Sequence, residues 1–193
     1  MQRSVNSTDY EIRAPRPEDQ SGIVSVHVNS WITSYQNVLP EVYLKGDDFH
    51  ERLAQRRKYV NELPGVKRVV VHRETGKVVG FGAAGPHRTA HPTFKGELYA
   101  LYLIQEVHGH GLGTALLNVL TQWLSEYGLN SMSVWVLKNN QGAQKFYAKS
   151  GGEPVEEQII QIGGVPYVEV CYGWKDLKQL ADRDAQKRNR QQA

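Results

Sequence analysis

The spacing of apolar residues along the chain changes between the alternation typical of strands and the three-and-four spacing typical of helices. Apolar and β-branched runs bounded by turn residues predict strands at 10–14, 97–104, 131–137, 155–162 and 165–174, with a hairpin over 66–85. The strand at 97–104 is mostly apolar on both faces, which predicts a central place in a sheet.

Two helices are predicted between the first strand and the hairpin. The first begins near Pro17 and ends before Leu39-Pro40, and its spacing places Trp31 on a mainly apolar face. A second, more polar helix is predicted over 41–61, before a proline and a glycine that end it.

Two further helices follow the 97–104 strand. One starts at Leu112 and ends before Gly128, and its apolar stripe is expected to comprise Leu112, Ala115, Leu116, Val119, Trp123 and Tyr127. Asn139 and Asn140 suit the cap of the last helix, which Gly151 closes.

Length and composition predict a soluble protein with one domain over 10–175, a polar extension at 1–9 and a basic polar tail at 176–193. The sequence holds no apolar stretch near the roughly 20 residues of a spanning helix, so no membrane partner is expected. Cys171 is the only cysteine, which excludes an internal disulfide and favours a cytoplasmic location. The net charge of +3 comes from residues 175–193, which hold six basic and three acidic residues, and no nucleic-acid partner is expected.

The segment HGHGLGTALL, residues 108–117, leads from a predicted strand into a predicted helix with three alternating glycines. Unpaired N–H groups at a helix start attract anions, and glycines let a phosphate approach the backbone. The dinucleotide fingerprint fails because Thr114 stands where a glycine is needed, and the P-loop fails because no lysine follows Gly113. His108 and His110 form only a short H-x-H pair, so no metal is expected.

These residues resemble the phosphate loop of the GNAT superfamily of acyl-coenzyme A dependent N-acetyltransferases, [QR]-x-x-G-x-[GA], with His108 in the place of Gln or Arg. A second family motif, N-x-x-A-x-x-[FL]-Y before a glycine pair, is matched by Asn140, Ala143, Phe146, Tyr147 and Gly151-Gly152. A looser family pattern, W-x-x-x-Y-x-x-x-L-P, is matched by Trp31, Tyr35, Leu39 and Pro40.

The resemblance implies an α/β (α+β) fold with a mixed, mostly antiparallel central sheet of about seven strands flanked by helices. The predicted order of strand, two helices, three strands, helix, strand, helix and two strands agrees with the family's order. The resemblance also implies acetyl-CoA as co-substrate. The residues that would hold it are Leu101, Tyr102 and Leu103 for the pantetheine arm, Gly109, His110, Gly111, Leu112, Gly113 and Thr114 for the pyrophosphate, and Asn140.

Acetyl transfer to an amine needs a base, an oxyanion donor and a proton for the leaving thiolate. Glu97 is the predicted base, with a solvated carboxylate as the alternative and His87 or His91 in reserve. A strand N–H near Leu101 is the predicted oxyanion donor if a bulge frees it from its neighbouring strand. Tyr147 matches the family's tyrosine beside the thioester sulfur and is the predicted acid, with simple aromatic packing as the alternative.

A primary amine of a small molecule is the expected acceptor. Family members that acetylate ribosomal protein N-termini often carry a glutamate where this sequence has Trp135. The acceptor pocket is expected among 31–35, 87–92 and 163–167. A protein lysine or N-terminus as acceptor, and a CoA-binding sensor without turnover, remain alternatives, and a homodimer is compatible with the sequence.

Overall fold

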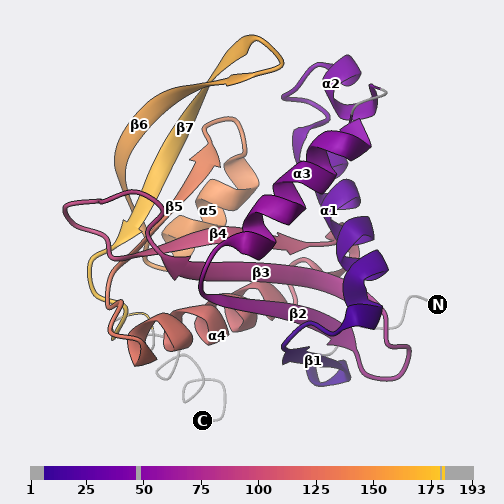
Figure 1. Ribbon diagram of the computed structural model, residues 1–193, viewed down its shortest axis with the longest axis horizontal. Coiled ribbons are helices and arrows are strands. Elements are labelled where there is room, and N and C mark those ends of the chain that lie inside the picture. The colour runs from indigo at the N-terminus through magenta and orange to yellow at the C-terminus, as the bar shows by residue number, and fades with distance from the viewer. Residues whose placement is uncertain (1–6, 47–48, 179, 181–193) are drawn as a thin grey trace. The chain divides into compact units, whose positions relative to one another are not determined.

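The computed structural model describes residues 7–46, 49–178 and 180. Its strands are β1 (Tyr10–Arg13), β2 (Val66–His72), β3 (Val78–Pro86), β4 (Gly96–Leu103), β5 (Met132–Leu137), β6 (Glu153–Ile162) and β7 (Val165–Trp174) (Figure 1). Its helices are α1 (Gln20–Tyr35), α2 (Glu41–Lys45), α3 (Phe49–Glu62), α4 (Leu112–Glu126) and α5 (Gln141–Lys149). Short 3-10 turns lie at Ser7–Asp9, Pro17–Asp19 and Gln105–Val107. Among the described helices, none is long and apolar enough to cross a membrane.

The strands form one seven-stranded sheet in the order β1-β2-β3-β4-β5-β7-β6. β4 pairs with β5 in parallel, through Gly96↔Met132 and Glu97↔Ser133. The pairs β1–β2, β2–β3, β5–β7 and β6–β7 are antiparallel. The predicted mixed sheet of seven strands and the central place of the 97–104 strand are confirmed.

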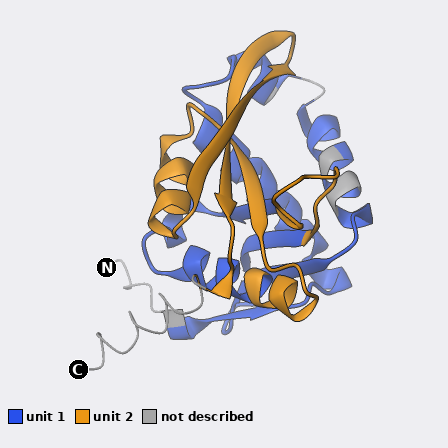
Figure 2. Cartoon of the chain, turned by 90° about the vertical axis from the view of Figure 1, so that its left-hand side faces the viewer, with its two compact units in different colours: residues 1–84, 99–120 blue, residues 85–98, 121–193 orange. Residues whose placement is uncertain are grey.

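Contacts between residues divide the chain into two compact units, which Figure 2 colours separately. Unit 1 comprises residues 1–84 and 99–120, and unit 2 comprises residues 85–98 and 121–193. Unit 1 therefore contains the phosphate-loop residues, and unit 2 contains both predicted catalytic residues, Glu97 and Tyr147.

In unit 1, helices lie on both faces of the strands. Successive residues of β3 face opposite sides, so one residue contacts the helix on one face and the next contacts the helix on the other. Phe81 points toward α1, where its ring lies 5.7 Å from that of His27. The next residue, Gly82, faces α4, and a Cβ placed on it would lie only 2.8 Å from Leu120 Cδ1. The missing side chain at this position lets α4 pack close to the strand.

In unit 2, α5 packs against β7 through aromatic side chains. The ring of Tyr147 lies 6.1 Å from those of Tyr172 and Trp174. Beyond β7, Leu177 and Leu180 are buried, and Leu177 N donates to Asn130 O at 2.9 Å. The packed chain thus continues into the predicted tail, whose residues 181–193 lie outside the described part, as do residues 1–6 of the predicted extension.

The single helix predicted over 41–61 is wrong, because the structure has two helices there, α2 and α3. Gly46 ends α2 in an extended conformation with φ −64° and ψ 160°. Glycine loses more conformational freedom in a helix than other residues, so the chain leaves the helix easily at this point.

The stripe predicted for α4 is also partly wrong. Tyr127 is 67% exposed, and Val119 and Trp123 are only half-buried. The predicted Leu112 and Leu116 are buried, and the other buried positions of the helix are Leu117, Leu120, Thr121 and Leu124. The buried face is thus rotated by about one residue from the predicted one, because Trp123 and Tyr127 stack on each other near the helix end.

Asp19 joins the end of β1 to the start of α1. Its carboxylate is only 4% exposed and accepts hydrogen bonds from Arg13 Nη1 at 2.6 Å, Arg13 Nη2 at 2.8 Å and Arg16 N at 2.6 Å. The hydrogen bonds from Arg13 hold the pKa of Asp19 below its ordinary value despite the opposing effect of burial. The ionised carboxylate therefore stabilises the fold above its unfolded-state pKa, and this stabilisation is lost as the pH falls through the lower folded-state pKa.

We expect Asp19→Asn to lower the free energy of unfolding at pH 7 by about 3 kcal/mol, because Arg13 loses its buried partner. The difference from wild type should narrow as the pH falls toward 3, measured by urea unfolding at several pH values. Glu157→Gln is the control, because Glu157 and its partner Lys138 are about half exposed and should matter little. A difference that stays constant with pH would contradict the assignment to charge.

Candidate functional site

The loop between β4 and α4 has the backbone conformation that only glycine adopts readily. Gly109 has φ +80° and Gly111 has φ +79°, and both residues are exposed. A Cβ placed on either glycine would meet nothing within 4 Å. The glycines are therefore required by the turn rather than by crowding, and open space lies in front of the loop.

The start of α4 presents unpaired donors next to this open space. The first hydrogen bond of the helix runs from Ala115 N to Gly111 O at 2.9 Å. The N–H groups of Leu112, Gly113 and Thr114 precede that bond and have no acceptor within the helix. Together with the helix dipole, which places about half a positive charge at this end, they suit an anion.

His108, which replaces the Gln or Arg of the motif, ties the loop to the end of β4. Its Nε2 lies 3.0 Å from Leu103 O, and Ser30 Oγ of α1 donates to the same oxygen at 3.1 Å. A carbonyl oxygen has two lone pairs, so this acceptor is fully used and a ligand contact of Leu103 must come from its N–H. Sequence reasoning missed this role of His108, because nothing in the motif indicates which atom its ring reaches.

The other strand residues predicted to bind the cofactor, Leu101 and Tyr102, are half-buried in unit 1. The ring of Tyr102 lies 5.1 Å from that of His27 and 5.3 Å from that of Phe81. The Tyr102 side chain therefore packs toward α1 and leaves only main-chain groups of this residue for the predicted cofactor contact.

In unit 2, Asn140 caps α5 as predicted, since its Oδ1 accepts a hydrogen bond from Ala143 N at 3.1 Å. The cap uses the carbonyl oxygen of the side chain, so a contact with the cofactor would use the amide N–H groups. That contact stays a prediction.

Tyr147 is 6% exposed and lies in an aromatic cluster with Phe146, Tyr172 and Trp174. Gly152 allows this cluster to close, because a Cβ there would lie 2.7 Å from Trp174 Cζ2. Packing of the Tyr147 ring does not conflict with the predicted role as an acid, because the packing contacts involve the ring and the acid would use the hydroxyl.

Glu97 is 2% exposed, which excludes the alternative of a solvated carboxylate. Arg88 binds it through three groups: the backbone N–H at 3.1 Å, Nε at 3.0 Å from both oxygens, and Nη2. His87 Nδ1 lies 4.0 Å from the carboxylate. A proton taken up by Glu97 would compete with these charge-assisted hydrogen bonds.

Of the two histidines predicted as alternatives to Glu97, His87 is better placed to act as the base. Its Nδ1 lies 2.6 Å from the carbonyl oxygen of Thr89, which can only accept, and 3.3 Å from the Thr89 N–H, which can only donate. We assign the proton to Nδ1, because the contact with the carbonyl oxygen is the shorter of the two. Nε2 then accepts a hydrogen bond from the hydroxyl of Ser133, 3.1 Å away on β5. His91 is a neighbour with its ring 5.1 Å away, and it pairs with Glu156 at 3.3 Å. Among the described residues, no group of three or more His, Cys, Asp or Glu could hold a metal ion.

The sequence matches the family described as "Acetyltransferase (GNAT) family" over residues 29–152. It is also 37% identical over 169 residues to the uncharacterized N-acetyltransferase YuaI of Bacillus subtilis (strain 168), a match that covers 88% of this chain and 95% of the relative. The chain belongs to the GNAT family of acetyltransferases. This membership makes it an acyl-CoA-dependent N-acetyltransferase.

Solved structures agree with the GNAT fold. The PaiA N-acetyltransferase of Thermoplasma acidophilum in complex with coenzyme A superposes with a TM-score of 0.63 at 20% identity, covering 83% of this chain and 97% of that one. The putative acetyltransferase yncA of Salmonella typhimurium with acetyl-CoA superposes with a TM-score of 0.58 at 18% identity, covering 86% and 92%.

In this GNAT chain we expect Arg88→Met to lower the free energy of unfolding by about 3 kcal/mol, because it leaves the Glu97 charge buried without its main partner. The double variant Arg88→Met/Glu97→Gln should recover part of the loss, measured by chemical denaturation. Lys138→Met is the control for removing an exposed cation. A loss below about 1 kcal/mol for Arg88→Met would show that the buried carboxylate does not depend on Arg88.

Proposed function

We propose that the chain transfers an acetyl group from acetyl-CoA to a primary amine of a small molecule. The observation that carries this proposal is the exposed turn at Gly109 and Gly111, which leads directly into the unpaired N–H groups of α4. Family membership supplies the reaction class, and this turn supplies a place for the diphosphate of the co-substrate.

The residues at the start of α4 fit a diphosphate. Leu112, Gly113 and Thr114 donate their N–H groups to it, and the open space in front of Gly109 and Gly111 lets its oxygens approach without meeting a side chain. When bound, acetyl-CoA supplies the acetyl group as an activated thioester. Main-chain groups of Leu101, Tyr102 and the Leu103 N–H orient the pantetheine arm, and an N–H near Leu101 is the proposed oxyanion donor. Asn140 contacts the cofactor through its amide N–H groups.

Tyr147 serves as the acid in this proposal, with its hydroxyl directed at the leaving sulfur. Reference pKa values near 10 for a phenol and 8.5 for a thiol make full proton transfer uphill by roughly 2 kcal/mol. A hydrogen bond from the hydroxyl to the sulfur is therefore sufficient. The ring contacts with Tyr172 and Trp174 hold the side chain in one orientation, which supports this role.

The acceptor must lose a proton before it attacks. An alkylamine with a pKa near 10 is neutral only about one part in 10³ at pH 7, so a base is needed. Glu97 was the base expected from sequence, but the Arg88 contacts favour His87, whose Nε2 is the unprotonated nitrogen. In this assignment Glu97 and Arg88 hold the loop that carries His87.

A small-molecule acceptor is favoured over a protein N-terminus by Trp135. This half-buried residue of β5 takes the place at which family members that act on ribosomal protein N-termini often carry a glutamate. A sensor that binds CoA without turnover is distinguished by measuring thiol release and CoA binding separately.

The first test measures thiol release from acetyl-CoA with a panel of primary amines. Cys171 is fully buried and burial raises the pKa of its thiol to about 12, so it should add little background to a thiol reagent.

The acid assignment is tested by a variant. Tyr147→Phe should lower kcat by about 10²-fold while CoA binding, measured by calorimetry, changes little. Tyr172→Phe removes a hydroxyl from the same cluster and is the matched control. Wild-type turnover in Tyr147→Phe would remove the acid assignment, and CoA binding without thiol release would favour the sensor.

The base assignment is tested by the pH profile of kcat/KM. His87→Gln should lower kcat/KM by about 10² and leave a residual rate that rises steadily with pH, because only the fraction of amine that is already neutral reacts. Glu97→Gln should have a smaller effect on the shape of the profile. A larger loss of kcat/KM and a larger change of the pH profile in Glu97→Gln than in His87→Gln would identify Glu97 as the base.

A further inference from the structure

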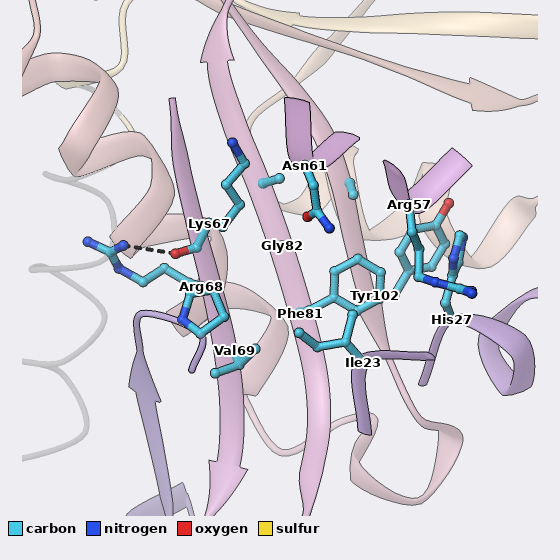
Figure 3. A pocket seen from close by; sticks show the side chains of 13 residues that line it. Ile23, His27, Arg57, Asn61, Lys67, Arg68, Val69, Phe81, Gly82 and Tyr102 are labelled. Carbon is cyan, nitrogen blue, oxygen red and sulfur yellow. Dashed lines mark hydrogen bonds between the residues drawn. The ribbon is translucent and has the colours of Figure 1, made fainter. Parts of the chain in front are cut away.

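Unit 1 contains a pocket whose side chains have no role in the function proposed above. It lies between α1, α3 and the strands β2, β3 and β4 (Figure 3). Its walls are largely apolar and include Ile23, Phe81 and Tyr102. We call it the basic pocket, because α3 and β2 add Arg57, Asn61 and Lys67 to these walls.

The cations of the basic pocket lack a counter-charge. Arg57 Nη1 is buried and has no hydrogen-bond partner among the described residues, and the described lining includes no Asp or Glu. Burial lowers the pKa of both Arg57 and Lys67, so each pays a desolvation cost for its charge. Both side chains are half-buried, and an anion from outside the chain would supply the counter-charge that the described lining does not.

The orientation of the polar groups agrees with this reading. In Figure 3 the side chains of Arg57 and Asn61 extend from α3 toward the rings that wall the pocket. The guanidinium of Arg68 points away and donates to Lys67 O at 2.9 Å. Lys67 Nζ donates to Leu63 O, which uses one of its three N–H groups. Arg57, Asn61 and Lys67 therefore keep donors for a ligand.

The size of the pocket restricts the anion. The pocket is partly open, and the space in it that a water-sized sphere can occupy is about 40 Å³. A single water needs roughly 10–15 Å³ on the same measure, so a small polar group such as a carboxylate fits while the rest of its molecule extends toward the opening. The apolar walls suit the hydrocarbon to which the carboxylate is attached.

The pocket also reaches the strand on which acetyl transfer is proposed to occur. Tyr102 and Ala100 line it, and Ala100 has only a methyl side chain, so the pocket floor approaches the main chain of β4. Tyr102 belongs to the segment 101–103 that is proposed to orient the pantetheine arm. A small molecule whose carboxylate is held by Arg57 would thus place its other end close to residues 101–103.

We propose that the basic pocket binds the carboxylate of a small molecule with an apolar body, and that this molecule is the amine acceptor, which makes the acceptor an amino acid. The second half of this statement rests on the proposed function. Arg57 provides the main charge, Lys67 and Asn61 provide further donors, and Phe81 and Tyr102 contact the apolar body.

The site itself is tested by calorimetry without any reaction. The probe is 3-phenylpropionate, with its uncharged amide and inorganic phosphate as comparators. The wild-type chain should bind the carboxylate, and Arg57→Met should weaken this binding at least about tenfold, whereas Arg57→Lys should retain part of it. Binding of the amide equal to that of the acid, preference for phosphate, or no loss in Arg57→Met would each overturn the site.

The acceptor assignment is tested by kinetics with matched pairs, such as phenylalanine with phenethylamine and 4-aminobutyrate with butylamine. The carboxylate member of a pair should have a kcat/KM at least about tenfold higher, and Arg57→Met should remove this preference through KM while the plain amine is unaffected. Equal use of both members would overturn the acceptor assignment and leave the proposed function intact. Absence of thiol release with every amine would instead count against the proposed function, while the calorimetric result would still decide the site.

Discussion

The left-handed backbone at Gly109 and Gly111 is the constraint on which the candidate site depends. Two residues with φ near +80° turn the chain from the end of β4 into α4 within a few positions. Any residue with a Cβ would be strained in this conformation, because its side chain would crowd the following peptide. The tight turn places main-chain donors at the exposed start of the helix, so the capacity to bind an anion comes from the backbone and not from a charged side chain.

Much of the fold could be predicted from the sequence, because local patterns determine it. The alternation over 97–104 and the paired β-branched runs over 66–85 predicted strands that the structure contains, and Asn140 was predicted as a helix cap. Errors arose where local patterns are ambiguous. Gly46 is a weak local signal for dividing a polar helix. The spacing of Trp123 and Tyr127 predicts core positions, whereas their rings stack on each other at the end of α4, 4.1 Å apart.

The candidate site was less accessible to sequence reasoning, because its partners come from distant positions. Gly111 and Tyr147 could be found from local sequence, because each occupies a defined position in a short motif. The environment of Glu97 depends on Arg88 from the preceding loop, and that of His87 depends on Ser133 from β5. The buried Nη1 of the half-buried Arg57, which has no hydrogen-bond partner among the described residues, follows from the packing of α3 on the sheet, which no local pattern expresses.

The carbonyl oxygen of Leu103 has a consequence for how this chain can diverge. It accepts from Ser30 on the first helix and from His108 at the entrance of the glycine turn. Two side chains that are far apart in the sequence therefore share one acceptor, and losing either donor leaves one lone pair of that oxygen without its hydrogen bond. How well either position tolerates substitution should therefore depend on the residue at the other, although the two lie on different elements.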